Sequence, residues 1–365
     1  MDVPLLPDHR GACVVNVVPA LLERRGPVTG ILPPEVLDAP RRVLLVVDGL
    51  GERQLTARPH VAPVLTAMAG AQLTTVAPST TAAALTAIVT AAPPGSHGLI
   101  GYRMHQPGGG IMSPIRWTLD GVDAREAVVP EETQVVEPFL GTSPAVVNKL
   151  LFRDSGFTRA QLRGARIAWY ATPAVIPVLA GEALRAGEPF VYAYWDGIDN
   201  VAHIHGHGAE YDAELAFVDR LVAGILDAAP AGTAVVVTAD HGHVATAGHE
   251  VEIAEDVRAM CTSLSGEARF AWLHCPADRA ADVLAAARAA HGDRAWVVPV
   301  ERVLDEGWLG PEVIPAARAR LGEVALVARG NTALTDPGYR GSALVSRHGS
   351  LTPEEMLVPL RWAVA

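Results

Sequence analysis

Cysteine is scarce in this 365-residue sequence. The three cysteines, Cys13, Cys261 and Cys275, are widely spaced and odd in number. They therefore provide neither a disulfide framework nor a zinc site built from thiolates. We predict that all three are reduced residues of the core, so any metal site has to be built from oxygen and nitrogen donors.

Positive charge is also in short supply. The chain has 29 Lys and Arg against 40 Asp and Glu, a formal net charge of -11 at pH 7, and its only lysine is Lys149. Nucleic-acid polymers and anionic membranes bind to clustered Lys and Arg, so this composition argues against both as partners. An anionic substrate has to be attracted locally.

Long apolar runs are absent as well. No stretch approaches the roughly 18 uninterrupted apolar residues of a membrane helix, because charges such as Asp48 and Arg153 interrupt the apolar segments. We therefore expect no integral membrane insertion. The N-terminal residues lack the basic and apolar regions of a secretory signal, and we expect a cytoplasmic location.

Short β-rich runs alternate with helix-like segments along the chain, which is typical of a parallel sheet covered by helices. Half of the residues are apolar, and the strand runs are continuously apolar rather than alternating. We expect an α/β fold with a mostly parallel central sheet flanked by helices on both faces. The predicted strands are residues 42–47, 72–76, 166–170, 190–195, 233–238 and 324–327, and the predicted helices are residues 82–91 and 209–228.

Two stretches interrupt this alternation. Residues 106–144 are rich in Gly, Pro and acidic residues, which predicts a loop-rich excursion near the site. Residues 254–315 contain an apparent strand, helix and strand, which predict a small subdomain: 270–274, 278–290 and 295–298. Because no linker separates two halves, we predict a single domain over residues 1–365 with these two insertions.

Polar residues directly follow several predicted strands, and ligands of open α/β sheets bind at the carboxyl ends of the strands. Asp48 follows the first strand, where an aspartate is often only a turn residue. Asp240 and His241 follow a later strand. Adjacent side chains of an extended chain point to opposite sides, so their joint action requires the chain to leave β geometry, which Gly242 permits.

Histidines gather after the predicted strand 190–195. If the chain turns helical after Asp196, then Asp199 and His203 lie four residues apart on one helix face, where a carboxylate and an imidazole can share a cation. The neighbouring histidines are interpreted as residues that support the ligands or as hydrogen-bonded loop residues: His205 and His207 in the first class, His243 and His249 in the second.

Three hydroxyl residues, Ser79, Thr80 and Thr81, precede the small-residue helix 82–91. A hydroxyl there is usually only a cap, but a helix N-terminus also favours an anion. A hydroxyl that is activated by metal coordination is a suitable nucleophile for a phosphoryl group. Late in the chain, His348 sits in a turn before a predicted helix start and by itself indicates little.

Together these elements supply three aspartates, three histidines and one threonine at strand ends or in adjoining turns. Zinc and manganese accept such oxygen and nitrogen donors. The sequence therefore predicts a site for divalent cations.

At this point the sequence resembles the alkaline phosphatase superfamily, and specifically its nucleotide pyrophosphatase/phosphodiesterase-like branch. Five motifs carry the resemblance, in the order of that family: VVDGLG, PSTTAAALTAIVTAAPPGSHGLIGY, DNVAH, TADHG and RHGSLTPEEMLVPL. They span Val46 to Leu360, although the stretches between them do not match.

The resemblance implies a role for each matching residue. It makes Thr81 the nucleophile, rather than Ser79 or Thr80. It also implies two divalent metal ions, which we expect to be zinc, with manganese as the other possibility. One ion would be held by Asp48, Thr81, Asp240 and His241, and the other by Asp199, His203 and His348.

The implied activity is metal-dependent hydrolysis of a small phosphoester or nucleotide through a covalent phosphothreonine, as in a phosphodiesterase or nucleotide pyrophosphatase. An ungapped count places Tyr102 where diesterases of the family carry an asparagine that binds the phosphoryl group. A phenolic hydroxyl can donate the same bond, but the difference leaves open that the protein is a phosphomonoesterase. The extra charge of a monoester usually meets a basic side chain, and Arg103 is the arginine nearest to the motif in the sequence. A metal-stabilised module that binds a nucleotide without cleaving it is the alternative from another class of protein.

Overall fold

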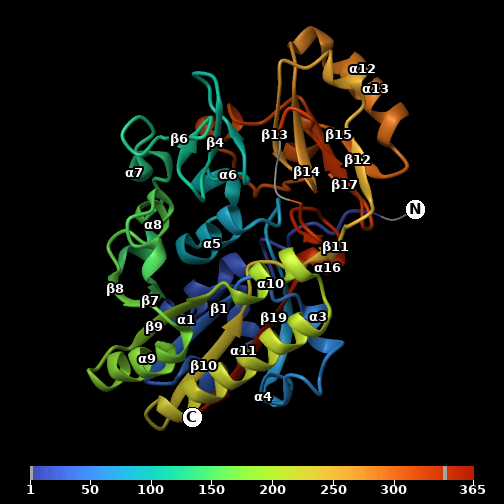
Figure 1. The fold of residues 1–365 in the computed structure, drawn as a ribbon. Helices are drawn as coiled ribbons and strands as arrows, with labels where there is room; N and C mark the ends of the chain where they lie inside the picture. Colours follow the sequence, from blue (N-terminus) through green and yellow to red (C-terminus); the bar gives the residue numbers. More distant parts are fainter. Residues whose placement is uncertain (1–2, 340–342) are drawn as a thin grey trace.

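The computed structural model describes residues 3–339 and 343–365. A seven-stranded sheet with the order β2-β19-β10-β1-β9-β7-β8 lies at its centre (Figure 1). β19 runs antiparallel to its two neighbours, whereas every other adjacent pair is parallel. The expected mostly parallel sheet is confirmed. Its strands are β1 (Arg41–Val47), β2 (Ala69–Thr74), β7 (Ala145–Lys149), β8 (Arg166–Tyr170), β9 (Phe190–Trp195), β10 (Thr233–Thr238) and β19 (Leu357–Val364).

Continuous apolar runs form the central strands because both faces of the sheet are covered. Every residue of β10 is buried, and so is every residue of β1 after Arg41, as expected for parallel strands between two helical layers. The predicted strands 42–47, 166–170, 190–195 and 233–238 coincide with β1, β8, β9 and β10. The predicted strand 72–76 lies slightly earlier in the chain, as β2.

The central sheet also differs from the prediction in three strands. Residues 324–327 form β16 (Val324–Ala328), which belongs to a second sheet, so their predicted place is wrong. The chain adds β7 and β19 to the central sheet instead. β7 ends in the polar pair Asn148 and Lys149, and β19 contains Pro359, which has no amide hydrogen to donate to a ladder. Because these residues interrupt the apolar runs, both strands were missed in the sequence.

Helices cover both faces of the central sheet. α4 (Pro63–Ala67), α9 (Ile176–Arg185) and α11 (Ala209–Ala228) pack together on one face, and α1 (Val17–Glu23), α5 (Thr81–Thr90) and α8 (Gly156–Gln161) pack together on the other. α11 matches the predicted helix 209–228, and it buries its periodic apolar residues Leu215, Val218, Leu221, Val222 and Ile225.

The remaining helices are mostly short. In the described part of the chain, no helix combines the length and the apolar character that crossing a membrane would require. Their bounds are α2 (Pro34–Leu37), α3 (Glu52–Thr56), α6 (Pro94–His97), α7 (Pro130–Thr133), α10 (Gly197–His205), α12 (Glu255–Arg258), α13 (Ala280–His291), α14 (Val300–Asp305), α15 (Pro315–Arg318) and α16 (Pro353–Met356).

A second, antiparallel sheet stands beyond the carboxyl ends of the central strands (Figure 1, upper right). It has the order β13-β14-β16-β15, with α13 packed on β15 and β16 over a separate apolar core. The predicted strand, helix and strand of this region coincide with β14, α13 and β15. Its other strands are β13 (Ser263–Glu267), β14 (Phe270–His274) and β15 (Ala295–Pro299). Two separate two-stranded pairings also form: β11 (Val244–Ala245) with β18 (Ser346–Arg347), and β12 (Glu250–Glu252) with β17 (Ala333–Thr335).

All three cysteines are free. Cys13 is fully buried in the main core, and Cys275 is buried in the core of the second sheet. Cys261 is only partly buried beside that core, so its predicted core position is wrong.

Residues 104–123 form a small antiparallel meander where the sequence predicts loops. Its strands are β3 (Met104–His105), β4 (Ile111–Ser113), β5 (Thr118–Leu119) and β6 (Val122–Asp123). Strands of two or three residues are too short to show a period in the sequence. The organisation as one domain with insertions at 106–144 and 254–315 stays a prediction.

A fully buried ion pair links the second sheet to the segment after β18. Arg269, in the turn between β13 and β14, donates from Nε and Nη2 to the two carboxylate oxygens of Glu355, at 3.0 and 2.6 Å. Both side chains are 0% exposed. Glu355 also accepts hydrogen bonds from the Ser350 backbone amide and the Thr352 hydroxyl. The pair therefore fixes the turn that follows His348 against the second sheet.

Breaking this pair should be costly. We expect Arg269→Met to lower the free energy of unfolding by about 3–5 kcal/mol, because it leaves a buried carboxylate without its partner. Urea denaturation measures the change. Arg279→Met is the control: Arg279 pairs with Asp282 at the surface, and its loss should cost about 0–1 kcal/mol. Equal effects of the two substitutions would contradict the role given to the buried pair.

Helix α5 is held in place by a buried histidine that follows it. His97 is 0% exposed, and its Nε2 donates to the Ala83 carbonyl at 3.1 Å while its Nδ1 accepts from the Leu99 amide at 3.1 Å. Both bonds require the neutral ring. Burial lowers the pKa of His97 to about 3, so the folded protein resists its protonation.

This histidine should make stability depend on pH. As the pH falls below about 6.5, the unfolded chain takes up a proton at His97 and the folded chain does not, so the wild type loses stability until about pH 3. His97→Gln removes the titration. We expect the variant to be less stable at pH 7.5, with the gap to wild type narrowing by about 1 kcal/mol at pH 5.5. Urea denaturation at both pH values measures the gap, and a constant gap would contradict the argument.

Candidate active site

The adjacent strands β1, β9 and β10 end at one edge of the central sheet, where their following residues converge. Asp48 comes directly after β1, Asp199 lies in the first turn of α10 after β9, and Asp240 follows β10. The backbone joins these turns, because the Asp199 amide donates to the Asp48 carbonyl at 3.1 Å. Asp48 and Asp240 are almost completely buried, at 2% and 0% exposure. The fold thus brings together the three aspartates, two of which were predicted from the strand ends.

One group of side chains surrounds His241. Its Nε2 lies 3.3 Å from Asp48 Oδ1, 3.2 Å from Asp240 Oδ2 and 3.1 Å from Thr81 Oγ1. The chain leaves β geometry after β10, as predicted, so that the adjacent Asp240 and His241 act at one point. Asp240 Oδ1 accepts from the backbone amides of Gly49 and His241, which leaves its Oδ2 facing the group.

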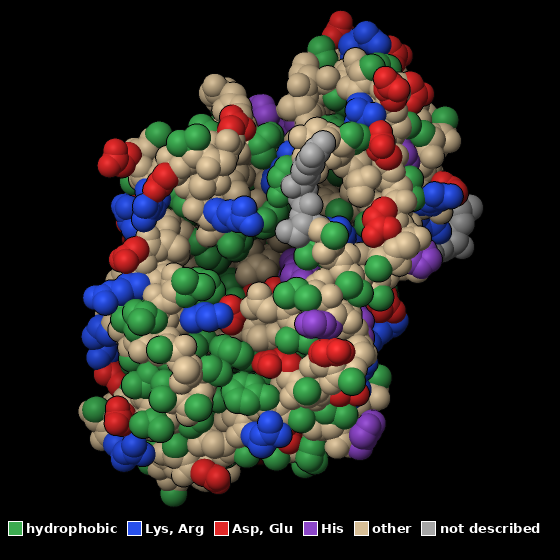
Figure 2. All heavy atoms as spheres, viewed as in Figure 1, with side chains coloured by type: hydrophobic (Ala, Val, Ile, Leu, Met, Phe, Trp, Pro, Cys, Tyr) green, Lys and Arg blue, Asp and Glu red, His purple; other side chains and the backbone are tan. Residues whose placement is uncertain are grey.

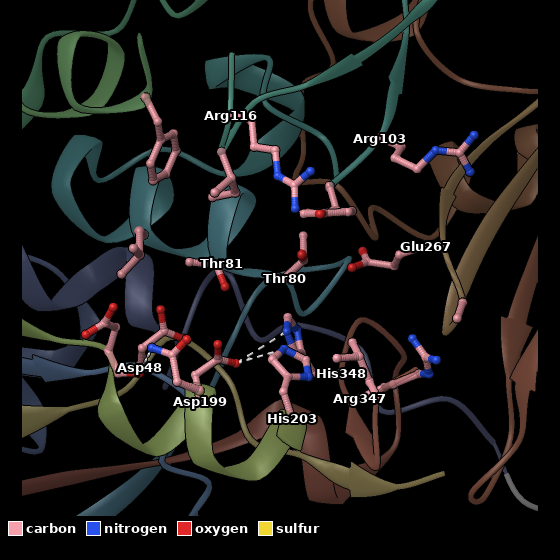
Figure 3. A pocket seen from close by; sticks show the side chains of 18 of the residues that line it. Asp48, Thr80, Thr81, Arg103, Arg116, Asp199, His203, Glu267, Arg347 and His348 are labelled. Atoms are coloured by element: carbon pink, nitrogen blue, oxygen red, sulfur yellow. Dashed lines mark hydrogen bonds and ion pairs between the residues drawn. The ribbon is translucent and has the colours of Figure 1, made fainter. Parts of the chain in front are cut away.

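A second group surrounds Asp199. His203 lies one turn later on α10, as the spacing predicts, with its Nε2 3.2 Å from Asp199 Oδ1. The Nε2 atoms of His243 and His348 lie 2.9 and 3.6 Å from the same oxygen. The His348 and His241 rings stack with centroids 3.6 Å apart, so the two groups adjoin. Figure 3 shows Asp48, Asp199, His203 and His348 along one wall of the cavity.

His243 is the member of this group that the sequence argument missed. It was interpreted as a loop residue, whereas it is fully buried and belongs with Asp199, His203 and His348 in one candidate metal-binding group. Its spacing of two residues from His241 was the available signal. Of the other nearby histidines, the His207 ring contacts the His243 ring edge-on, and His205 is exposed.

Hydrogen bonds to backbone oxygens orient the imidazoles. The Nδ1 atoms of His203 and His348 lie 2.8 and 2.9 Å from the carbonyls of Ser346 and Ser79. Because a carbonyl only accepts, each Nδ1 carries a proton, and each Nε2 is directed into the group. Metal-binding histidines are held in this way. Burial, and then the nearby His241, keep the pKa of His348 well below its usual value, so its ring is neutral.

The buried carboxylates need a cation. Burial, followed by the charges of Asp240 and Asp199, raises the pKa of Asp48 well above its usual value, and burial also raises the pKa of Asp240. Asp48 Oδ1 and Asp240 Oδ2 have no hydrogen-bond partner among the described residues. An uncompensated buried charge is expensive, and bound divalent cations offset it. The donors present therefore fit metal ions.

The three candidate hydroxyls have different positions. Ser79 is fully buried, donates to the Ser350 carbonyl at 2.6 Å and accepts from the Gly349 amide at 3.1 Å, so its role is structural. Thr80 is the N-cap residue of α5, without a capping hydrogen bond. Thr81 begins the helix, one residue earlier than predicted, and its hydroxyl faces His241. The N-terminus of α5 therefore points at the candidate metal-binding groups, where it favours an anion.

A cavity of about 1210 Å³ opens above these groups and is also lined by Tyr102, Arg103, Arg116, Lys149 and Glu267. Figure 2 shows it as a hollow with histidine at its floor. No hydrogen bond joins Tyr102 to Thr81 among the described residues. Burial raises the pKa of Tyr102, so its phenol stays protonated and can donate.

Glu267, at the end of β13, is a further residue of the cavity that the sequence did not indicate. It reaches the cavity from the second sheet, and one of its oxygens, Oε1, has no hydrogen-bond partner among the described residues. Burial raises its pKa to about 8, so this carboxyl is mostly neutral at pH 7. Glu267 lies outside the five motifs, so no sequence pattern indicated that it lines the cavity.

Comparisons with known proteins agree with this geometry. The sequence matches the family model of type I phosphodiesterases and nucleotide pyrophosphatases over residues 42–351. Murine and human ectonucleotide pyrophosphatase/phosphodiesterase 5 are both 15% identical, with TM-scores of 0.66 and 0.67, over 88% of this chain and 87% of theirs.

Phosphonoacetate hydrolase from Sinorhizobium meliloti 1021, solved in complex with phosphonoformate, is 19% identical with a TM-score of 0.61, over 89% of this chain and 90% of its own. A search of curated protein sequences gives no significant match. These structures share the alkaline phosphatase-like fold. Because the family model covers most of the residues, this chain belongs to the type I phosphodiesterase/nucleotide pyrophosphatase family of phosphoester hydrolases.

Proposed function

We propose that this hydrolase cleaves a phosphodiester or pyrophosphate bond of a small anionic substrate, with Thr81 as the nucleophile and two divalent cations. One observation carries the proposal. The Thr81 hydroxyl lies at the N-terminus of α5 and 3.1 Å from His241 Nε2, where buried oxygens of Asp48 and Asp240 have no hydrogen-bond partner in the described part of the chain. A purely structural metal site would gain nothing from this hydroxyl.

The donor types support zinc, and manganese also accepts them. We propose that Asp48, Thr81, Asp240 and His241 hold one ion, and that Asp199, His203 and His348 hold the other. Asp199 is close enough to both groups of donors to belong to either one. When bound, two such ions would lower the pKa of the hydroxyl and stabilise the charge of the attacking and leaving oxygens.

The residues of the chain then perform an in-line displacement. Thr81 Oγ1 attacks phosphorus, and the bond from phosphorus to the leaving oxygen breaks as the bond to Thr81 forms. Water next attacks the phosphothreonine and restores the Thr81 hydroxyl. The free amides and the dipole of α5 attract the phosphoryl oxygens, and we propose that Tyr102 donates a hydrogen bond to one of them in place of an asparagine amide.

A nucleotide is a reasonable substrate class on the basis of a relative. An inactive threonine-to-alanine variant of murine ectonucleotide pyrophosphatase/phosphodiesterase 5 was solved in complex with AMP. Membership of a hydrolase family disfavours the module that only binds a nucleotide. A cytoplasmic location stays a prediction from the sequence.

Metal binding can be tested on the purified protein. Zn²⁺ added after chelation should raise the free energy of unfolding, by about 2.7 kcal/mol at a hundredfold excess over the dissociation constant, because it binds the folded state. Asp240→Asn should lose bound metal, as measured by elemental analysis. Asp219→Asn is the control, since Asp219 is a buried aspartate that accepts from the Val64 and Leu65 amides instead. Unchanged metal content in Asp240→Asn would refute the assignment.

The nucleophile can be tested by substitution. Thr81→Ala should lower turnover of p-nitrophenyl phosphate esters by about 10³-fold or more with its metal retained, because the covalent step is lost. Thr86→Ala is the matched control, since the Thr86 hydroxyl donates to the Ala82 carbonyl within the same helix. Acid quenching of the wild type during turnover should trap phosphate on the peptide containing Thr81. Near-normal hydrolysis by Thr81→Ala would show that Thr81 is not the nucleophile.

A further inference from the structure

The basic side chains around the cavity differ in whether their charge is already neutralised. Lys149 Nζ lies 2.8 Å from an Asp196 carboxylate oxygen. Arg103 lies 3.8 Å from Asp336 and stacks on the ring of Tyr339 at 3.9 Å. In Figure 3 its guanidinium points away from Thr81. Neither cation is therefore available to a substrate without first giving up its partner.

Arg116 differs from these residues. It lines the same cavity, yet within residues 3–339 and 343–365 it has no carboxylate partner and no hydrogen bond. Figure 3 shows its side chain extending from the meander toward Thr80 and Thr81. Its charge also acts on Tyr102, whose pKa it lowers against the larger effect of burial. The unpaired cation thus lies on the wall of the cavity opposite the aspartates.

The turn that carries Arg116 is firmly anchored, so the fold sets the point at which this side chain enters the cavity. Arg116 lies between β4 and β5, and the next residue, Trp117, is fully buried and donates from Nε1 to the Val128 carbonyl at 2.6 Å. The Trp117 ring packs so closely on Gly156 that a Cβ there would lie 2.2 Å from it. On the other side, Ile115 packs against the main core.

The charge balance of the site explains why a cation is needed on this wall. Three aspartates and a Thr81 alkoxide carry four negative charges, which two divalent cations would just neutralise. A singly charged diester adds one negative charge to a neutral centre, whereas a more highly charged substrate adds at least two. Glu267, which also lines the cavity, forms no ion pair with Arg116 among the described residues. Arg116 is placed to meet the additional charge.

We propose that Arg116 selects substrates with a second negative charge on or beside the scissile phosphoryl group over singly charged phosphodiesters. This inference rests on the proposed function and deepens it by naming the substrate class. Two sources supply the same chemistry, the dianion of a phosphomonoester and the distal phosphate of a nucleoside polyphosphate. A guanidinium binds either one through charge-assisted, paired hydrogen bonds.

The test compares three substrates in four proteins. Wild type, Arg116→Ala, Arg116→Lys and Arg125→Ala are assayed at low salt with p-nitrophenyl phosphate, ATP and bis(p-nitrophenyl) phosphate. Arg125 is the control because it is a partly exposed arginine of the same region whose partner is Asp123. Arg116 is exposed, so its substitution should leave the thermal unfolding midpoint unchanged.

We expect Arg116→Ala to lower kcat/KM about 10–100-fold for one or both of the more highly charged substrates, and to change bis(p-nitrophenyl) phosphate hydrolysis by less than about threefold. Arg116→Lys should restore part of the loss. A loss confined to p-nitrophenyl phosphate identifies the monoester dianion, and one confined to ATP identifies the distal phosphate. Equal losses for all three substrates, or no loss, would overturn the proposal.

A binding measurement separates this inference from the proposed function. In the Thr81→Ala background, inorganic phosphate at pH 8 should bind about 10–100-fold more weakly when Arg116 is also replaced by Ala, as measured by calorimetry. This readout requires no turnover. If the wild type hydrolyses none of the three substrates, the proposed function fails, but the phosphate titration still tests the role of Arg116. An unchanged affinity for phosphate would overturn that role.

Discussion

The convergence of Asp48, Asp199 and Asp240 at one edge of the sheet is the constraint on which the rest of the site depends. Parallel pairing of β1 with β9 and β10 forces their following turns together. Burial of these carboxylates is unfavourable unless positive charge accompanies them. The oriented imidazoles, the Thr81 hydroxyl and the N-terminus of α5 are all arranged around that point, so one electrostatic requirement organises residues from five separate segments.

The two additions to the central sheet supply the opposite wall of the cavity. The meander carries Arg116, and the second sheet carries Glu267. The buried pair of Arg269 with Glu355 connects that second sheet to the turn after His348. The same contact thereby fixes a candidate metal ligand and the wall that faces it. The packing of the second sheet consequently links the candidate metal-binding groups to the opposite wall of the cavity.

Much of the fold was predictable where burial leaves a direct trace in the sequence. Strands such as β1 and β10 are continuous apolar runs because helices cover both of their faces, and α11 shows its apolar spacing because one side of it faces the core. β19 was missed because Pro359 interrupts its pattern, and residues 324–327 were assigned to the wrong sheet. An apolar run reveals that a strand is buried but not which sheet it joins.

The sequence by itself determined the chemistry of the site: strand ends located Asp48 and Asp240, and a spacing of four placed Asp199 and His203 on one helix face. Only the tertiary structure decided that His243 lies beside Asp199, that Ser79 is structural, and that the unpaired arginine is Arg116 rather than Arg103. The physical reason is that local spacing fixes neighbours within one element. Contacts between residues far apart in the chain depend on how sheets and insertions pack, and no short pattern records that packing.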